Sequence, residues 1–430
     1  MGLDPASERD PGFHFSGMAV VGRMSRRRSE RRRDRSPRSP RAAAPPPPAP
    51  DRRRWGVAVA LAVAALAVSV AFLATRPEGP ARLRRRAEAA AGGKEWREAL
   101  DLWRRVNATA AVTASTLLEE GRAALALGRA SRGEAALGRA VALDPSVARA
   151  WILLLEIRRV EDRWFDAAAV GWEAVGEVAP HDRALVLREL TLAALSQIPD
   201  ELARDTLRKW IAADPDDAEA EAALMRRIGA DPRPDDPDLE TRIARLEALV
   251  AERPELPNPR AALAEALADA GEVDRGRAVL DAWPDSARDA RYDRLRGRWD
   301  LEYDGVPVLA VAALRRALKA APHDWRARYR LARALAALGR REEAAREAET
   351  VARVREALDP MTAGLDLDDA LAKLDRPGVR AAIADACARV GLDDLARAWR
   401  ELPPPTAQPA ADGGPGLPPS RGKTDREAAG

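Results

Sequence analysis

The sequence predicts an all-α protein: an α-solenoid of stacked helix–turn–helix repeats, preceded by one transmembrane helix and flanked by disordered N- and C-terminal tails. Three observations lead to this fold class. A helical hairpin pattern recurs at an interval of 34 residues, about 20 uncharged residues precede the first repeat, and both chain ends are rich in Pro together with Arg or Gly. The sequence has no sustained alternation of apolar and polar residues, the pattern that would indicate strands.

One copy of the repeat occupies Ala114–Val147. Its first helix places Leu117 and Gly121 four positions apart, and therefore on one helix face. Gly128 predicts a tight turn, and Pro145 ends the unit because proline cannot continue a helix. The second helix carries small or apolar residues at the same spacing, which would let the two helices pack closely: Gly133, Leu137 and Ala140.

The unit recurs in phase along most of the chain after residue 80. The interval of 34 residues separates Ala114 from Ala148, and the period resumes after one irregular stretch. The units are predicted to begin at Pro80, Ala114, Ala148, Ala184, Pro257, Arg291 and Trp325. A glycine precedes the turn at Gly128, Gly271, Gly305 and Gly339.

This pattern resembles the tetratricopeptide repeat family, whose unit is a helix–turn–helix of 34 residues. The resemblance covers roughly Pro80 to Arg355, and it predicts about eight units over residues 80–356. It implies a superhelix whose first helices line a concave groove, and such grooves hold a protein or peptide partner. Residues 357–402 are predicted to form a helical C-terminal cap with polar faces, and residues 403–430 a disordered tail.

Two units depart from the pattern. Arg294 and Arg298 stand where the unit at Arg291 should be apolar, so its first helix is expected to be shifted by about two residues, with Tyr292, Leu295 and Trp299 facing the core. The unit after Ala218 is interrupted by the irregular stretch Gly229–Pro237, which contains three prolines and several aspartates. The aspartate spacing is not that of an EF-hand loop, which favours a solvated loop over a calcium site.

The N-terminal residues 1–54 are predicted to be a disordered Arg/Pro-rich tail. They hold 14 arginines against 6 acidic residues, an excess larger than the net charge of +3 of the whole chain. The rest of the chain is therefore mildly acidic, which does not favour nucleic-acid binding by the repeats. An RNA-associated role of the Arg-rich tail remains an alternative.

Residues 55–75 contain the predicted membrane span, Gly56–Thr75. This uncharged stretch would be about 30 Å long as a helix, which matches the hydrocarbon core of a bilayer. A cleaved signal peptide and a buried core helix are the alternatives, and the length of the apolar run favours an uncleaved anchor. The Arg-rich tail predicts a cytoplasmic N-terminus and an extracytoplasmic, periplasm-like location of the repeats.

The sequence contains no recognisable catalytic grouping, so we expect a protein that is not an enzyme and has no cofactor and no metal. Only His14, His181 and His323 are present, and the last two occupy equivalent turns between repeats. The single cysteine, Cys387, excludes an internal disulfide and is expected to be a small buried residue. No phosphate-binding loop or nucleophile elbow occurs.

A partner is expected to bind where tyrosines and arginines gather in two adjacent units, because aromatic and arginine side chains are common interface anchors. The candidate groove residues are Arg296, Trp299, Tyr303, Arg326, Tyr329, Arg330 and Arg333. The partner segment would be acidic or end in a carboxylate. The sequence thus predicts a membrane-anchored scaffold for protein assembly at the cell envelope, with a non-catalytic accessory subunit of an envelope polymer export machinery as the alternative.

Overall fold

The computed structural model describes residues 63–64, 78–195, 198–359 and 365–403. The chain divides into two units, Met1–Arg76 and Pro77–Gly430, and the helices below belong to the second. The predicted tails 1–54 and 404–430 lie outside the described residues, as does the predicted span Gly56–Thr75 apart from Val63 and Ala64. Among the described residues, no helix has both the length and the apolar character needed to span a bilayer.

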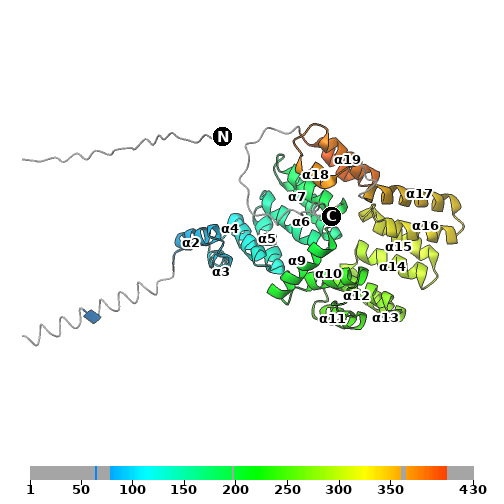
Figure 1. Ribbon diagram of the computed structural model, residues 1–430, viewed down its shortest axis with the longest axis horizontal. Helices are drawn as coiled ribbons and strands as arrows, with labels where there is room; N and C mark the ends of the chain where they lie inside the picture. The colour runs from blue at the N-terminus through cyan, green and yellow to red at the C-terminus, as the bar shows by residue number, and fades with distance from the viewer. Residues whose placement is uncertain (1–62, 65–77, 196–197, 360–364, 404–430) are drawn as a thin grey trace, which may run out of the picture. The chain divides into compact units, whose positions relative to one another are not determined.

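The described residues of the second unit form helices and no strand, which confirms the predicted all-helical solenoid (Figure 1). From Pro80 to Leu358 the helices pair into consecutive hairpins, and three shorter helices follow. The hairpins are α2 (Pro80–Gly92) with α3 (Trp96–Asn107), α4 (Ala114–Ala126) with α5 (Ala130–Leu143), α6 (Ala148–Val160) with α7 (Trp164–Glu177), α10 (Ala218–Ala230) with α11 (Leu239–Glu252), α12 (Pro257–Asp269) with α13 (Val273–Asp281), α14 (Ala290–Glu302) with α15 (Pro307–Ala320), and α16 (Trp325–Ala337) with α17 (Arg341–Leu358). The exception is the pair α8 (Arg183–Leu195) and α9 (Asp200–Ala213): α8 packs mainly on α6 and α7, and α9 packs mainly on α10. A short 3₁₀ helix, η1 (Asp285–Ala287), precedes α14, and the last helices are α18 (Leu367–Ala372), α19 (Val379–Arg389) and α20 (Asp393–Glu401).

The helix starts follow the period read from the sequence. Helices α4, α6, α12 and α16 begin at the predicted residues, and α8 and α14 begin one residue earlier than predicted. The predicted turn glycines adopt the left-handed backbone conformation, with φ of 75° at Gly128 and 74° at Gly339. A residue with a Cβ is strained in the left-handed conformation, so glycine ends the first helix of a hairpin with less backbone strain.

Small residues let the two helices of a hairpin approach closely. A Cβ added at Gly121 of α4 would lie 2.7 Å from Cγ of Leu137 in α5. A Cβ added at Gly133 would lie 3.0 Å from Cγ of Leu125. Each glycine therefore provides the space that the leucine of the opposite helix fills, as the repeat pattern predicts.

Two of the three core residues predicted for α14 are buried, and the helix begins one residue before Arg291. Leu295 and Trp299 are buried, and Tyr292 packs against Trp283 with ring centroids 5.6 Å apart. Arg294 and Arg298 are only partly exposed and pair with Glu265 at 2.7 Å and Glu302 at 3.1 Å.

The acidic loop between α10 and α11 is organised by a buried arginine. Arg204 of α9 has no exposed surface, and its Nη1 donates to Asp236 at 2.7 Å. Its Nη2 donates to the main-chain oxygen of Arg227 at 3.0 Å. The positive charge that the loop aspartates surround is thus the Arg204 guanidinium.

The C-terminal helices pack back onto a much earlier helix, α8, through α20. Trp399 of α20 is buried, and its Nε1 donates to Oγ1 of Thr191 in α8 at 2.8 Å, although the two residues lie 208 positions apart. Cys387 and Leu395 belong to the same hydrophobic core as Leu187 of α8. The superhelix therefore turns far enough to bring its last helices against α8, whereas the sequence predicted only a terminal cap with polar faces.

Candidate functional site

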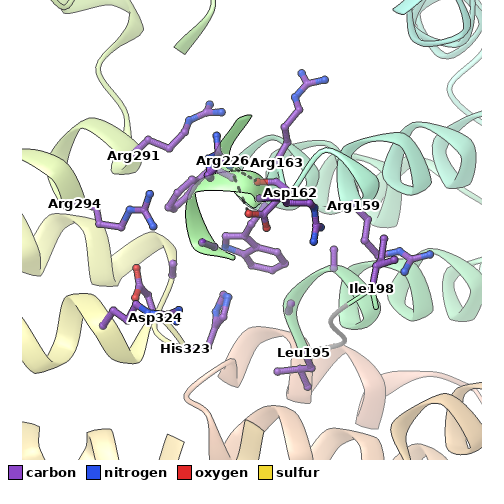
Figure 2. Close-up of a pocket in the computed structure, with 18 of the residues that line it drawn as sticks. Arg159, Asp162, Arg163, Leu195, Ile198, Arg226, Arg291, Arg294, His323 and Asp324 are labelled. Carbon is purple, nitrogen blue, oxygen red and sulfur yellow. Dashed lines mark hydrogen bonds and ion pairs between the residues drawn. The ribbon is translucent and has the colours of Figure 1, made fainter. Parts of the chain in front are cut away.

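A cavity of about 690 Å³ lies between the early and the late hairpins. Its wall combines the end of α6 and the start of α7 with α10, α14 and the turn before α16. Figure 2 shows Arg294, His323 and Asp324 entering from one side, while Arg159 and Arg163 enter from the other. The cavity is therefore formed by residues that are far apart in the sequence and that only the turn of the superhelix brings together.

An ion-pair network crosses this region and fixes the start of α7 against α14. Arg291 is buried, and its Nη1 and Nη2 donate to the two carboxylate oxygens of Asp166 at 3.0 and 2.7 Å. Arg163 donates to the same carboxylate at 2.9 Å and to Glu134 at 2.8 Å. Although burial alone would raise the pKa of Asp166, the hydrogen bonds and charge of Arg291 hold that pKa well below its usual range.

Four further arginines line the cavity with few acceptors around them. Among the described residues, their buried Nε atoms, in Arg159, Arg226, Arg227 and Arg294, have no hydrogen-bond partner. Within the same residues the Arg226 side chain donates one hydrogen bond, to the main-chain oxygen of Asp162 at 3.4 Å, and Arg294 donates one to Glu265 at 2.7 Å. Because a guanidinium carries five N–H donors, this wall is rich in unused donors.

The turn before α16 adds aromatic and imidazole groups to the wall. The rings of Trp164 and His323 meet edge to face with centroids 4.8 Å apart. Burial lowers the pKa of His323 to about 4, so its imidazole is neutral near pH 7. The Asp324 carboxylate accepts from the main-chain N–H of Ala327 at 3.0 Å and caps α16.

The seven predicted partner-binding residues fall into two groups: three make internal contacts, and four lie on one face of α16. Trp299 is fully buried and belongs to the core, and Tyr303 packs on it with ring centroids 5.2 Å apart. Arg296 is engaged by Asp300 at 2.9 Å and by Asp281 at 3.2 Å. These three side chains are therefore committed to internal contacts.

The other four predicted residues share one face of α16. Arg326 lines the cavity and stacks on the ring of Trp325, with its guanidinium carbon 4.7 Å from the ring centroid. Tyr329 is 52% exposed. Arg330 pairs with Glu302 at 2.9 Å, and Arg333 lies 3.6 Å from the same carboxylate. These residues remain available as a surface, and no contact with a partner tests them.

Of the cavity arginines, only Arg326 is among the residues that the sequence predicts to bind a partner. Arg294 is the one further arginine that the sequence marks as unusual, because it interrupts the apolar pattern of its unit. Arg159, Arg226 and Arg227 give no such signal, since each occupies an ordinary polar position of its own repeat. Their convergence depends on contacts between hairpins that the periodicity does not encode.

Two further residues, Cys387 and His181, carry side chains that could take part in chemistry, and they lie at separate places in the chain. Cys387 is buried, and burial raises the pKa of its thiol to about 12, so the sulfur stays a protonated core group. His181 is exposed on its turn, far along the chain from His323. Within the described ranges, no cluster of three or more His, Cys, Asp or Glu residues could hold a metal ion.

The fold and the cavity define a helical-repeat protein of the solenoid class. A family model for the tetratricopeptide repeat matches residues 243–298 and 304–357, which cover α11 to α14 and α15 to α17. These two stretches are therefore similar to tetratricopeptide repeats, in agreement with the resemblance seen in the sequence. The search of curated proteins returns no match.

Solved structures similar to this chain share little sequence identity with it. A tetratricopeptide repeat protein from Parabacteroides merdae is 12% identical, with a TM-score of 0.29, over 60% of this chain and 98% of that one. Human IFIT1 in a dimer with m7Gppp-AAAA is 16% identical, with a TM-score of 0.27, over 65% of this chain and 72% of that one. The Cut9–Hcn1 hetero-tetramer of the APC/C gives 20% identity and a TM-score of 0.31, over 64% and 52%. Similarities of this size carry no inference about ligands or partners.

Proposed function

We propose that this chain is a non-catalytic, membrane-anchored scaffold whose repeats recruit an acidic segment of a partner protein at the cell envelope. The observation that carries the proposal is the exposed face of α16. Arg326, Tyr329, Arg330 and Arg333 follow the spacing i, i+3, i+4 and i+7, which places them along one side of the helix. We call this set the α16 stripe.

The α16 stripe has the composition of a binding surface for an acidic segment. Tyr329 offers an exposed aromatic ring, and the Arg333 guanidinium lies 5.9 Å from its centroid. Glu302 is shared by Arg298, Arg330 and Arg333, so one carboxylate serves three positive charges. The remaining positive charge favours an incoming carboxylate, and Arg can bind it with two parallel hydrogen bonds.

The membrane anchor of the proposal is Gly56–Thr75. It rests on the absence of charge over a length that spans a bilayer. The Arg-rich tail before it would keep the N-terminus in the cytoplasm and place the repeats on the other side. Only a few residues separate the segment from α2, so the repeats would stay close to the bilayer.

Partner binding is tested with the full chain in detergent and a short fluorescent peptide rich in Glu and ending in a free carboxylate. We expect saturable binding at low ionic strength, measured by fluorescence anisotropy. The triple variant Arg326→Glu, Arg330→Glu, Arg333→Glu should lose it, because each change replaces attraction by repulsion. A Gln-rich peptide of equal length serves as the ligand control.

The matched protein control changes three exposed arginines far from α16, as Arg97→Glu, Arg104→Glu, Arg139→Glu. It alters the net charge equally and should bind like the wild type. Equal loss in both triple variants would show a non-specific effect of net charge, and unchanged binding by the α16 triple variant would refute the docking surface. Circular dichroism checks that both variants keep their helices.

Anchoring is tested by fractionating cells that express the full chain. The wild type should stay in the membrane pellet after carbonate extraction, and Leu66→Arg with Val70→Arg should release it. Protease added to intact spheroplasts should digest the repeats if they face outward. Extraction of the wild type by carbonate would refute the anchor, and protection of the repeats would refute the orientation.

A further inference from the structure

Several arginine N–H groups that line the central cavity have no acceptor among the described residues. Arg159 and Arg227 donate no side-chain hydrogen bond to the described residues, and Arg226 and Arg294 donate one each. The four guanidiniums together carry about twenty N–H donors, at five per arginine. A ligand that fills this wall must therefore supply acceptors.

Among the described residues, few carboxylates lie within ion-pair distance of these arginines. Arg227 has Asp200 at 3.8 Å, and that carboxylate is also held by Arg204 and Arg233. Arg226 has Asp162 at 3.5 Å and shares Glu265 with Arg294, which holds it at 2.7 Å. Within 4 Å the four cations thus meet three carboxylates, one of which mainly serves other arginines; the charges of Glu156 and Glu189 act on Arg159, and that of Asp324 acts on Arg294, from farther away.

The remainder of the cavity wall is aromatic and apolar. Trp164, Phe165 and Trp325 line it together with Leu195 and Ile198. A volume of about 690 Å³ lies within the range of ordinary small-molecule sites, about 300–1,000 Å³. A ligand with an organic body and several anionic oxygens would match both halves of the wall.

We propose that the central cavity binds a small, multiply charged oxyanion, in the form of a phosphorylated or polycarboxylate organic molecule. The arginines on α6, α10 and α14 bind its oxygens, and the aromatic side chains at the starts of α7 and α16 cover its body. This proposal goes beyond the scaffold function, because the residues that line the cavity are not those of the α16 stripe. Arg326 alone belongs to both sets.

Such a ligand would also hold the superhelix closed. Arg159 and Arg227 come from early hairpins, whereas Arg294 belongs to α14, so one bound anion connects both sides of the cavity. Binding to the folded state alone stabilises it by mass action. Occupation of the cavity should therefore raise the unfolding temperature of the repeats.

The test titrates the full chain, purified in detergent, with pyrophosphate and separately with citrate at low ionic strength, by isothermal calorimetry. At least one anion should bind with a stoichiometry of one. Arg227→Gln and Arg294→Gln should each weaken it by about tenfold or more, the size expected for a lost charge-assisted hydrogen bond. Arg245→Gln on the exposed face of α11 is the matched control and should bind within about twofold of the wild type.

A second variant keeps the proposal testable if the arginine variants fail to fold. Ala230 is an exposed residue at the end of α10 that lines the cavity, so Ala230→Glu adds a carboxylate without removing a core side chain. It should abolish anion binding and raise the unfolding temperature without ligand. Binding of pyrophosphate alone identifies a phosphorylated ligand, and binding of citrate alone a polycarboxylate. Binding of neither anion, or binding by Ala230→Glu and Arg227→Gln equal to that of the wild type, overturns the proposal.

Discussion

Arg291 and Asp166 lie 125 positions apart in the sequence, yet their side chains form a two-point ion pair. The Nη1–Oδ2 distance is 3.0 Å and the Nη2–Oδ1 distance is 2.7 Å. Arg291 opens α14 and Asp166 lies in the first turn of α7, so the pair connects two hairpins that are not neighbours in the repeat order. It links two distant hairpins directly beside the cavity.

Removing one partner of this pair should cost more than removing a surface charge. Asp166→Asn is expected to lower the free energy of unfolding by about 2–3 kcal/mol, because it leaves the buried Arg291 guanidinium with fewer anionic acceptors. A double-mutant cycle with Arg291→Gln should give a coupling of about 1 kcal/mol or more, measured by urea denaturation. Additive losses would show that the pair contributes nothing beyond its separate parts.

The surface pair of Arg84 and Glu88 provides the control for this cycle. Its atoms are as close, at 2.8 Å, but both side chains are about half exposed. Glu88→Gln should therefore change stability by no more than about 0.5 kcal/mol.

Glu189 gives the chain a pH-dependent stability with a defined sign. It is buried on α8, where burial first, and the charge of Glu156 second, raises its pKa to about 7. In the unfolded chain the same carboxyl titrates near its ordinary value of about 4.5, so the native state retains a proton between these two values. The stability that this group contributes is present at low pH and declines as the pH rises from about 4.5 to about 7.

Glu189→Gln should remove this dependence, because the amide stays neutral. The variant is expected to gain stability over the wild type as the pH rises from 5 to 8, and the difference should level off above pH 7. Arg149, Arg159 and Arg188 also surround the carboxyl and moderate the effect. Urea denaturation at each pH measures it, with Glu240→Gln on the exposed face of α11 as control. A difference that stays constant from pH 5 to 8 would contradict the assignment.

Two glycines of the same helix test the close packing between hairpins. A Cβ at Gly171 in α7 would lie 2.3 Å from Cδ2 of the buried Leu190, whereas a Cβ at Gly176 would meet nothing within 4 Å. Gly176→Ala should therefore stabilise the chain by about 1 kcal/mol through helix propensity alone. Gly171→Ala gains the same propensity but must displace Leu190, at a cost of about 1–3 kcal/mol.

Thermal unfolding followed by circular dichroism compares the two variants. We expect the melting temperature of Gly176→Ala to exceed that of Gly171→Ala by several degrees. Equal melting temperatures would indicate that α7 and α8 lie far enough apart to accept a Cβ at Gly171 without displacing Leu190.

Much of the fold follows from local sequence rules. The positions of Ala114, Ala148 and Trp325 at helix starts are set by the period, and Gly128 ends its helix because of its backbone freedom. The burial of Leu295 and Trp299 in α14 could also be predicted from their spacing. Each of these features is decided by residues within one repeat.

The closure of the superhelix and its cavity could not be predicted in this way. The contact between Trp399 and Thr191 depends on the accumulated rotation of all the hairpins between them, and no pair of neighbouring repeats specifies it. For the same reason Arg159, Arg227 and Arg294 look like unrelated polar residues in the sequence. The tyrosines near Arg326 indicate a binding residue in the sequence, but they do not indicate that it lies at the cavity.

The C-terminal helices pack on α8, and this contact closes the superhelix. Hydrogen exchange followed by mass spectrometry tests this contact, on the full chain and on Trp399→Ala, a change that removes a buried ring and should cost about 3–5 kcal/mol locally. We expect faster exchange in α8, α19 and α20 of the variant and unchanged exchange in α2 and α3. Exchange in α8 that is identical in the two proteins would contradict it.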